Sequence, residues 1–95
     1  MSWPTDITAR NKGRLLEVAF DDGEVIRLSA ERLRVESPSA EVQGHSPSQK
    51  KIVTGKENVA IVAIEPVGNY AIKIVFDDGH DTGLYSWDYL RKLAS

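Results

Sequence analysis

Apolar residues alternate with polar or small ones in two segments of the chain, which is the pattern of a half-buried β-strand. The segments are residues 16–20 and 70–76, and each runs into an Asp-Asp-Gly sequence. An Asp-Gly pair is typical of a two-residue hairpin turn, because glycine accepts a positive φ at no steric cost. The pattern therefore predicts two β-hairpins, whose return strands carry Ile26 and Leu84 on their apolar faces.

A serine follows each return strand and is well placed to cap a helix. Ser29 and Ser86 are each followed by an acidic residue in what would be the first helical turn, where the helix dipole favours negative charge. The Phe-Asp-Asp-Gly sequences lie 56 residues apart and the two serines 57 apart. We interpret the chain as one hairpin-plus-helix unit used twice around a shared core. The second helix should be the longer one, with Leu33 and Leu90 buried in matching roles.

Two further strands and a long loop complete the predicted fold. A short strand should surround Ile7, and residues 59–64 should form a central strand because they are apolar on both faces and rich in β-branched residues. Residues 35–58 show neither the two-residue period of a strand nor the 3.6-residue period of a helix, and they contain several Ser, Pro and Gly. This composition indicates a functional or mobile loop. The expected class is α+β: a small, mostly antiparallel sheet, two hairpin-plus-short-helix units and a long central loop, in a single domain over residues 1–95.

Composition excludes several classes of function. The 95 residues, 41% of them hydrophobic, are enough for one core. A net charge of −2 argues against non-specific nucleic-acid binding, and the absence of cysteine excludes disulfides, thiolate metal sites and a cysteine nucleophile. No signal-peptide pattern or membrane-length apolar run is visible. We expect a cytoplasmic protein with neither a nucleic-acid nor a membrane partner.

The chain offers little catalytic chemistry. The carboxylate pairs of the two hairpins could act as acid and base, but Asp before Gly more often hydrogen-bonds its own turn. Neither Ser29 nor Ser86 lies in a Gly-x-Ser-x-Gly elbow, so capping is the favoured role. The aromatic group of Tyr85, Trp87 and Tyr89 is more typical of a core than of a stacking surface. We therefore expect that the protein is not an enzyme.

Three segments together resemble a known family. Residues 33–42, 67–72 and 78–87 are similar to the gamma-butyrobetaine hydroxylase-like N-terminal domain family, and Asp-Gly-His followed by Gly-x-Tyr-x-Trp is the most specific part. Members of the family stand in front of an iron- and 2-oxoglutarate-dependent oxygenase domain, are attached to P-loop iron–sulfur scaffold proteins, or occur alone in bacteria. Because the oxygenase His-x-Asp motif is missing, the resemblance implies the stand-alone bacterial form.

The resemblance also implies a degenerate metal site. In the hydroxylase the domain is a structural zinc module, and its three cysteine positions fall on Ser37, Ser39 and Val42, with the histidine at His80. Serine is a poor zinc ligand and valine is none. We therefore expect no cofactor, a vestigial site at these four positions, and folding without metal.

Two functions from different classes fit these observations. The first is an uncharacterised, non-catalytic accessory or interaction module, whose protein partner could be an iron–sulfur or metal-cofactor protein through the family's fusions. The alternative is a metal-binding protein with a site rebuilt from His80, His45 and carboxylates such as Glu41, Asp78 or Asp81.

For the interaction module, the expected surface combines residues 35–48 with the second hairpin turn. Its candidate contact residues are His45, His80, Asp81 and Tyr85, and His80 would make a contact sensitive to pH near neutrality. A simpler interpretation of the vestigial site remains open. Ser37 and Ser39 could hydrogen-bond with the histidine in place of the lost metal, because buried polar groups normally find partners.

Overall fold

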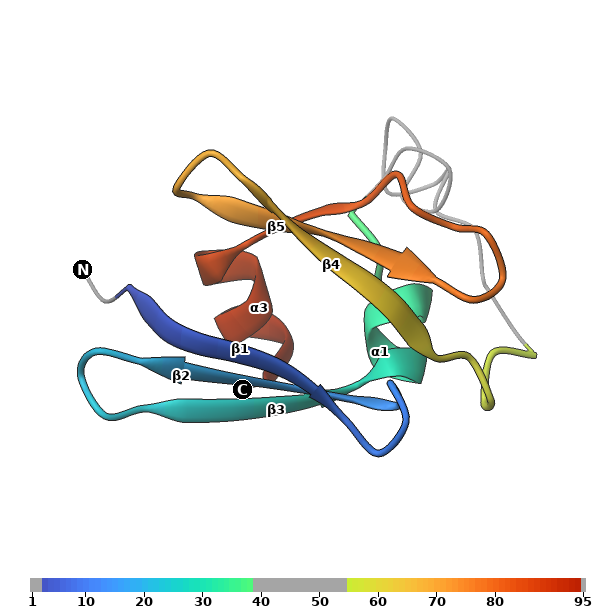
Figure 1. The fold of residues 1–95 in the computed structure, drawn as a ribbon, viewed down its shortest axis with the longest axis horizontal. Coiled ribbons are helices and arrows are strands. Elements are labelled where there is room, and N and C mark those ends of the chain that lie inside the picture. Colours follow the sequence, from blue (N-terminus) through green and yellow to red (C-terminus); the bar gives the residue numbers. More distant parts are fainter. Residues whose placement is uncertain (1–2, 39–54, 95) are drawn as a thin grey trace.

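Two three-stranded antiparallel sheets and two short helices make up the computed structural model, which describes residues 3–38 and 55–94 (Figure 1). In both sheets, strands that are consecutive in the sequence are also neighbours in the sheet. The first unit comprises β1 (Pro4–Arg10), β2 (Leu15–Phe20), β3 (Val25–Ser29) and α1 (Ala30–Val35). The second unit comprises β4 (Ile61–Val67), β5 (Ala71–Phe76), β6 (Leu84–Ser86) and α3 (Trp87–Ala94). The α+β class and the doubled unit are confirmed, but the strands form two sheets where the sequence suggested one.

The repeat is larger than a hairpin and a helix, because the strand before each hairpin also belongs to it. The outer strands start with the pairs Pro4–Phe20 and Ile61–Phe76, and each has a register shift after that first pair. From there the pairings correspond one by one, so that Glu17 of β2 occupies the place of Lys73 of β5. Each unit is therefore a strand–strand–strand–helix module.

The Phe-Asp-Asp-Gly turns are three-residue loops, which corrects the predicted two-residue turns. In the first, the Phe20 amide donates to the Glu24 carbonyl at 2.8 Å and the Gly23 amide donates to the Phe20 carbonyl at 3.1 Å. A two-residue type I′ turn would need positive φ at Asp22 as well, and only Gly23, at 89°, has it. Asp22 instead accepts a hydrogen bond from the Glu24 amide at 2.9 Å, which is the predicted turn-capping role.

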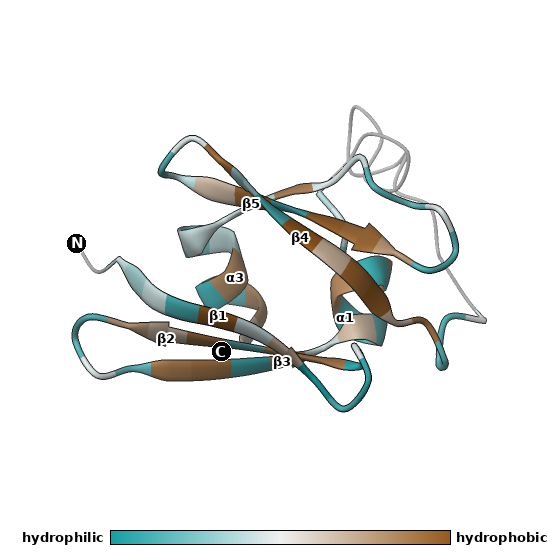
Figure 2. Ribbon diagram, viewed as in Figure 1, coloured by the Kyte–Doolittle hydropathy of each residue, from teal (hydrophilic) through white to brown (hydrophobic). Residues whose placement is uncertain are grey.

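The inward faces of both sheets and one side of each helix form a single apolar core (Figure 2). The core contains Leu16 and Val18 from β2 and Ile74 from β5, all without exposed surface. Leu33 of α1 and Leu90 of α3 are also completely buried, as the repeat predicted. Because each sheet has one apolar face, the two units cover each other.

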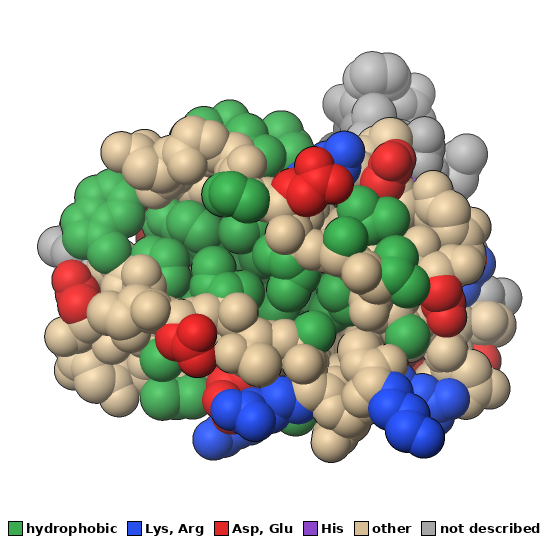
Figure 3. All heavy atoms as spheres, in the orientation of Figure 1, with side chains coloured by type: hydrophobic (Ala, Val, Ile, Leu, Met, Phe, Trp, Pro, Cys, Tyr) green, Lys and Arg blue, Asp and Glu red, His purple; other side chains and the backbone are tan. Residues whose placement is uncertain are grey.

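The strand expected to be central lies at an edge. β4 starts at Ile61 and flanks β5, which is the middle strand of its sheet. Val62 lies at the register shift between Ile61 and Ala63 and is 62% exposed, so this strand is not buried on both faces. Pro66 lies within β4, where an edge position tolerates its missing N–H. The edge strands β1 and β4, one from each sheet, share one face of the molecule, where hydrophobic side chains gather (Figure 3).

Both helices begin at the predicted serines. Ser29 Oγ accepts a hydrogen bond from the Arg32 amide at 3.1 Å, and Ser86 Oγ accepts one from the Tyr89 amide at 3.2 Å. α1 has six residues and α3 has eight, so the second is the longer. In the described parts of the chain, no helix has the length and apolar character needed to span a bilayer.

Each helix carries an arginine that reaches the hairpin turn of the other unit. Arg34 of α1 forms an ion pair with Asp78 at 2.8 Å, and Arg91 of α3 forms one with Glu24 at 3.0 Å. The Arg91 guanidinium also lies 4.0 Å from the centre of the Phe20 ring. These reciprocal contacts fasten the two units together at both ends of the core.

The matched burial of the two leucines leads to a stability prediction. Leu90→Ala should lower the free energy of unfolding by about 2–5 kcal/mol, because a fully buried leucine leaves a cavity, and Leu33→Ala should cost a similar amount. Urea denaturation measures both. The control is Val62→Ala on the exposed edge strand, which should cost less than about 1 kcal/mol. Equal costs at Leu90 and Val62 would contradict the packing described here.

Candidate functional site at the second hairpin turn

The Asp78 carboxylate is the centre of a charged cluster. Its Oδ2 atom lies 2.7 Å from Lys56 Nζ and 2.8 Å from Arg34 Nε, and its Oδ1 atom accepts a hydrogen bond from the His80 amide at 3.1 Å. Burial alone would raise the pKa of this carboxyl, but the bonds from Lys56, the turn amide and Arg34 outweigh it and hold the pKa below its ordinary value. Asp78 is therefore a stable anion that joins three segments.

His80, two residues further on, contacts the segment that follows α1. Its Nε2 atom lies 2.8 Å from Ser37 Oγ, and both residues are buried. The simpler interpretation left open above is thus confirmed for Ser37 and the histidine, while Ser39 lies outside the described residues. The distance would suit a serine–histidine catalytic pair, but Ser37 has no exposed surface, so a substrate could not reach its hydroxyl in this conformation.

Two tyrosines hold the end of α1 against the second unit. The Tyr85 hydroxyl donates to the Leu33 carbonyl at 2.6 Å, and the Tyr89 hydroxyl donates to the Glu36 carbonyl at 2.5 Å. The last carbonyls of a helix lack partners within it, so these bonds satisfy them. Burial raises the pKa of the Tyr85 hydroxyl, which keeps it protonated and able to donate.

Gly83 allows these groups to approach each other. A Cβ atom at this position would lie 2.5 Å from Ser37 Oγ and 3.2 Å from Tyr85 Cε1, so a side chain would displace the serine. The glycine of the Gly-x-Tyr-x-Trp motif therefore has a packing role. The Trp of the same motif, Trp87, donates its indole N–H to the Asn69 carbonyl at 3.0 Å and packs against the core.

The structure separates the residues of the predicted interaction surface. Tyr85 is fully buried and His80 is 7% exposed, so neither side chain lies at the surface as that prediction required. Asp81 is exposed beside them. His45, together with the vestigial positions Ser39 and Val42, lies outside the described residues.

The geometry of Ser37 and His80 does not fit the zinc site that the resemblance implies. Two ligands of one tetrahedral zinc ion, each about 2.1 Å from the metal, lie about 3.4 Å apart. Ser37 Oγ and His80 Nε2 are only 2.8 Å apart and bond directly, which leaves no space for an ion between them. Among residues 3–38 and 55–94, no three histidines or carboxylates come together as metal ligands. A site that includes His45 stays a prediction.

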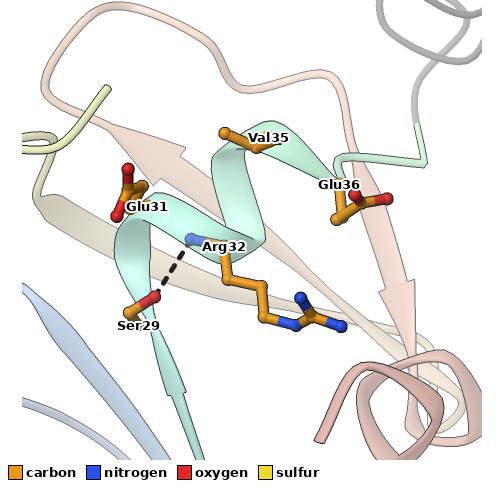
Figure 4. A pocket seen from close by; sticks show the side chains of 5 residues that line it. All are labelled: Ser29, Glu31, Arg32, Val35 and Glu36. Atoms are coloured by element: carbon orange, nitrogen blue, oxygen red, sulfur yellow. Dashed lines mark hydrogen bonds between the residues drawn. The ribbon is translucent and has the colours of Figure 1, made fainter. Parts of the chain in front are cut away.

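A pocket of about 240 Å³ lies along α1, and His80 is not among the residues that line it (Figure 4). It is lined by Ser29, Glu31, Arg32, Val35 and Glu36. All five belong to one short helix and its caps, and Arg32 already donates from Nε to the Leu93 carbonyl at 3.0 Å. Polar groups from several elements do not converge here, as they do in a ligand site.

Comparison with known proteins supplies the family. The model of the family described as "Gamma-butyrobetaine hydroxylase-like, N-terminal" matches residues 7–91. The chain belongs to this family. The matched model describes the N-terminal part of such proteins, and no curated protein matches the chain.

Solved structures of similar proteins agree with the fold. A crystal structure of a DUF971-family protein of unknown function from Acidithiobacillus ferrooxidans has a TM-score of 0.80 and 43% identity, over 97% of this chain and 92% of that one. An NMR solution structure has a TM-score of 0.82 and 56% identity, over 99% and 70% of the two chains. A second NMR structure has a TM-score of 0.78 and 47% identity, over 99% and 73%.

Sequence reasoning missed two residues of the cluster. Arg34 occupies the same place in the repeat as Arg91, so the repeat could have drawn attention to it. Lys56 carries no such signal, because nothing local in the sequence indicates that it pairs with Asp78.

The depressed pKa of Asp78 leads to a prediction about pH. Asp78→Asn should lower the free energy of unfolding near neutral pH by about 1–3 kcal/mol, because Arg34 and Lys56 lose their counter-ion. A carboxylate whose folded pKa lies below its unfolded value, about 3.9, stabilises the fold above that value and loses this contribution as the pH falls. Urea denaturation at a series of pH values should therefore show a constant difference above about pH 5 that shrinks below about pH 4.

Asp81→Asn, at an exposed neighbouring position, is the matched control and should lack most of this difference. A difference between wild type and Asp78→Asn that is the same at every pH would contradict the assigned role of the charge.

The misfit of the zinc geometry leads to a prediction about metal. Protein purified without metal-affinity steps should keep its melting temperature when a strong chelator is added, because the core and the hydrogen bonds around His80 hold the fold. Elemental analysis should find less than stoichiometric zinc or iron. A stoichiometric metal whose removal lowers the melting temperature would contradict this and support the rebuilt site with His45.

Proposed function

We propose that the protein is a non-catalytic accessory module that binds a partner protein through the surface around its second hairpin turn. The supporting observation is that side chains from distant parts of the chain converge on this turn. Arg34, Ser37 and Lys56 all bond to Asp78 or His80. Turns held in place by a rigid scaffold are common sites of binding.

The departures from the internal repeat favour the same region. In the first unit the position of His80 is taken by Glu24, which pairs with Arg91. The buried histidine–serine pair is therefore not needed to build the repeated module. Because Asp81 is the exposed residue next to it, we assign the direct contact to Asp81 and a supporting role to His80 and Tyr85.

The partner class is inferred from the family alone. In other members of the family that this chain resembles, the domain is attached to iron–sulfur scaffold proteins or to an iron-dependent oxygenase. Proteins that carry iron cofactors are therefore the first candidate partners. This association does not come from the site, because a fold does not determine a function.

Comparison of two charge-reversal variants tests the proposal. Asp81→Lys changes the proposed contact, and Asp88→Lys makes the same change on the exposed side of α3. Affinity purification with wild type should identify proteins that Asp88→Lys retains and Asp81→Lys loses by about tenfold or more, since one reversed contact costs at least 1.4 kcal/mol. Both variants should first be shown to melt as wild type does. Partners that bind all three proteins equally would place the interaction elsewhere.

A further inference from the structure

The outer face of the first sheet carries a charged arrangement that the proposed site does not use. Glu17 lies in the middle strand, directly across from Arg27 of β3 and diagonally from Arg10 of β1. Arg10 Nε donates to Glu17 Oε1 at 3.0 Å, and Arg27 Nε donates to Glu17 Oε2 at 2.9 Å. One carboxylate thus holds two guanidinium groups by their inner nitrogens.

The outer nitrogens of both guanidiniums remain available. No hydrogen bond to a described residue engages Nη1 or Nη2 of Arg10 or Arg27, and the two side chains are 53% and 61% exposed. Glu17 is only 17% exposed and is firmly ionised, because hydrogen bonds from Arg10 and then Arg27 lower its pKa against the effect of burial. The pair is therefore preorganised, with two guanidinium ends directed away from the same anchor.

The adjoining β1–β2 turn adds two more cations. Lys12 and Arg14 are exposed and form no ion pair with the described residues. Lys12 has a φ of 59°, a left-handed conformation that costs a lysine energy. The turn is held against the second unit, because the Gly13 carbonyl accepts a hydrogen bond from the Ile61 amide at 2.7 Å. Lys and Arg side chains gather along this edge of the molecule (Figure 3).

The internal repeat shows that the fold does not require these charges. By strand register, the second sheet has Lys73, Leu84 and Val67 at the positions of Glu17, Arg27 and Arg10. The corresponding turn contains Gly68 and Asn69 and no charge. The same architecture is therefore built without the cluster.

We propose that Arg10, Arg27, Lys12 and Arg14 form a docking surface for a short acidic segment of a partner protein, with Glu17 as the positioning residue. Two oriented guanidiniums suit carboxylates, which accept paired N–H donors. This surface lies on a different sheet from the one proposed above and does not depend on it.

An acidic protein segment fits better than a nucleic acid. The other end of the same sheet is negative, with Asp6, Asp21, Asp22 and Glu24. A long polyanion following the strands would meet these carboxylates, and the whole chain carries a net charge of −2. Nucleic-acid binding depends on a row of phosphate contacts, for which this patch is too small.

Fluorescence anisotropy with a labelled oligoglutamate peptide tests the surface in the whole chain. The wild-type protein should bind oligoglutamate more tightly than it binds oligolysine or inorganic phosphate. It should also bind oligoglutamate more tightly than an oligothymidylate that carries the same number of negative charges. The double variant Arg10→Gln/Arg27→Gln should weaken binding by about tenfold or more. Lys73→Gln removes one positive charge from the other sheet and should bind as wild type does.

The Glu17→Gln variant distinguishes binding to positioned arginines from binding that depends on net charge alone. This change makes the protein more positive, so attraction between net charges alone would strengthen binding. If Glu17 positions the arginines, its neutral amide can accept from only one of them, and binding should weaken by about threefold or more. The double variant Arg10→Lys/Arg27→Lys keeps both positive charges but loses the paired N–H donors of the guanidinium groups. It should therefore also bind the peptide more weakly. Tighter binding by Glu17→Gln, or preference for the oligothymidylate, would overturn the proposal.

Discussion

Each three-stranded sheet of this protein has one apolar face, and the structure depends on the fact that these two faces cover each other. The inward residues of β2 and β5, together with Leu33 and Leu90 of the helices, share a single core. The reciprocal ion pairs of Arg34 and Arg91 fasten the same two units from outside. Because the units close on each other, Ser37 from the end of the first meets His80 from the turn of the second. The candidate site is thus a product of the pairing of the units.

The repeat also distinguishes positions that build the fold from positions free to serve another purpose. The turn glycines, the capping serines and the turn-capping aspartates recur in both units with the same bonds. His80 and Glu17 do not recur, since Glu24 and Lys73 stand in their places. Where the two units carry different residues at the same position, the shared architecture does not explain why that residue is present. This is why both proposed surfaces lie at such departures.

Local patterns in the sequence were sufficient for the elements but not for their arrangement. The alternating strands, the capped helices and the burial of Leu33 and Leu90 follow from short-range periodicity and turn chemistry. The division into two sheets, which moves residues 61–64 to an edge, depends on pairings between distant strands that no local pattern encodes. The turn length was mispredicted because an Asp-Gly pair suits both two- and three-residue loops.

The site was predictable to a similar extent. The contact between Ser37 and the histidine followed from the family resemblance and from the tendency of buried polar groups to pair. The burial of His80 and Tyr85 was not foreseen, since both are polar residues near a turn and nothing nearby in the sequence covers them. Lys56 reaches Asp78 across more than twenty positions of sequence, and only the folded chain brings them together.

The contacts around the second hairpin turn lie at the corner where the family resemblance implies a metal site. A metal at the implied position would join the end of α1 to the second hairpin turn. Here several independent bonds already join these elements: Ser37 to His80, Arg34 to Asp78, and Tyr85 to the Leu33 carbonyl. Each such bond contributes on the order of 1 kcal/mol, and more where a charge takes part. The corner between α1 and the second hairpin turn is therefore fastened by the chain's own side chains, in addition to the shared core.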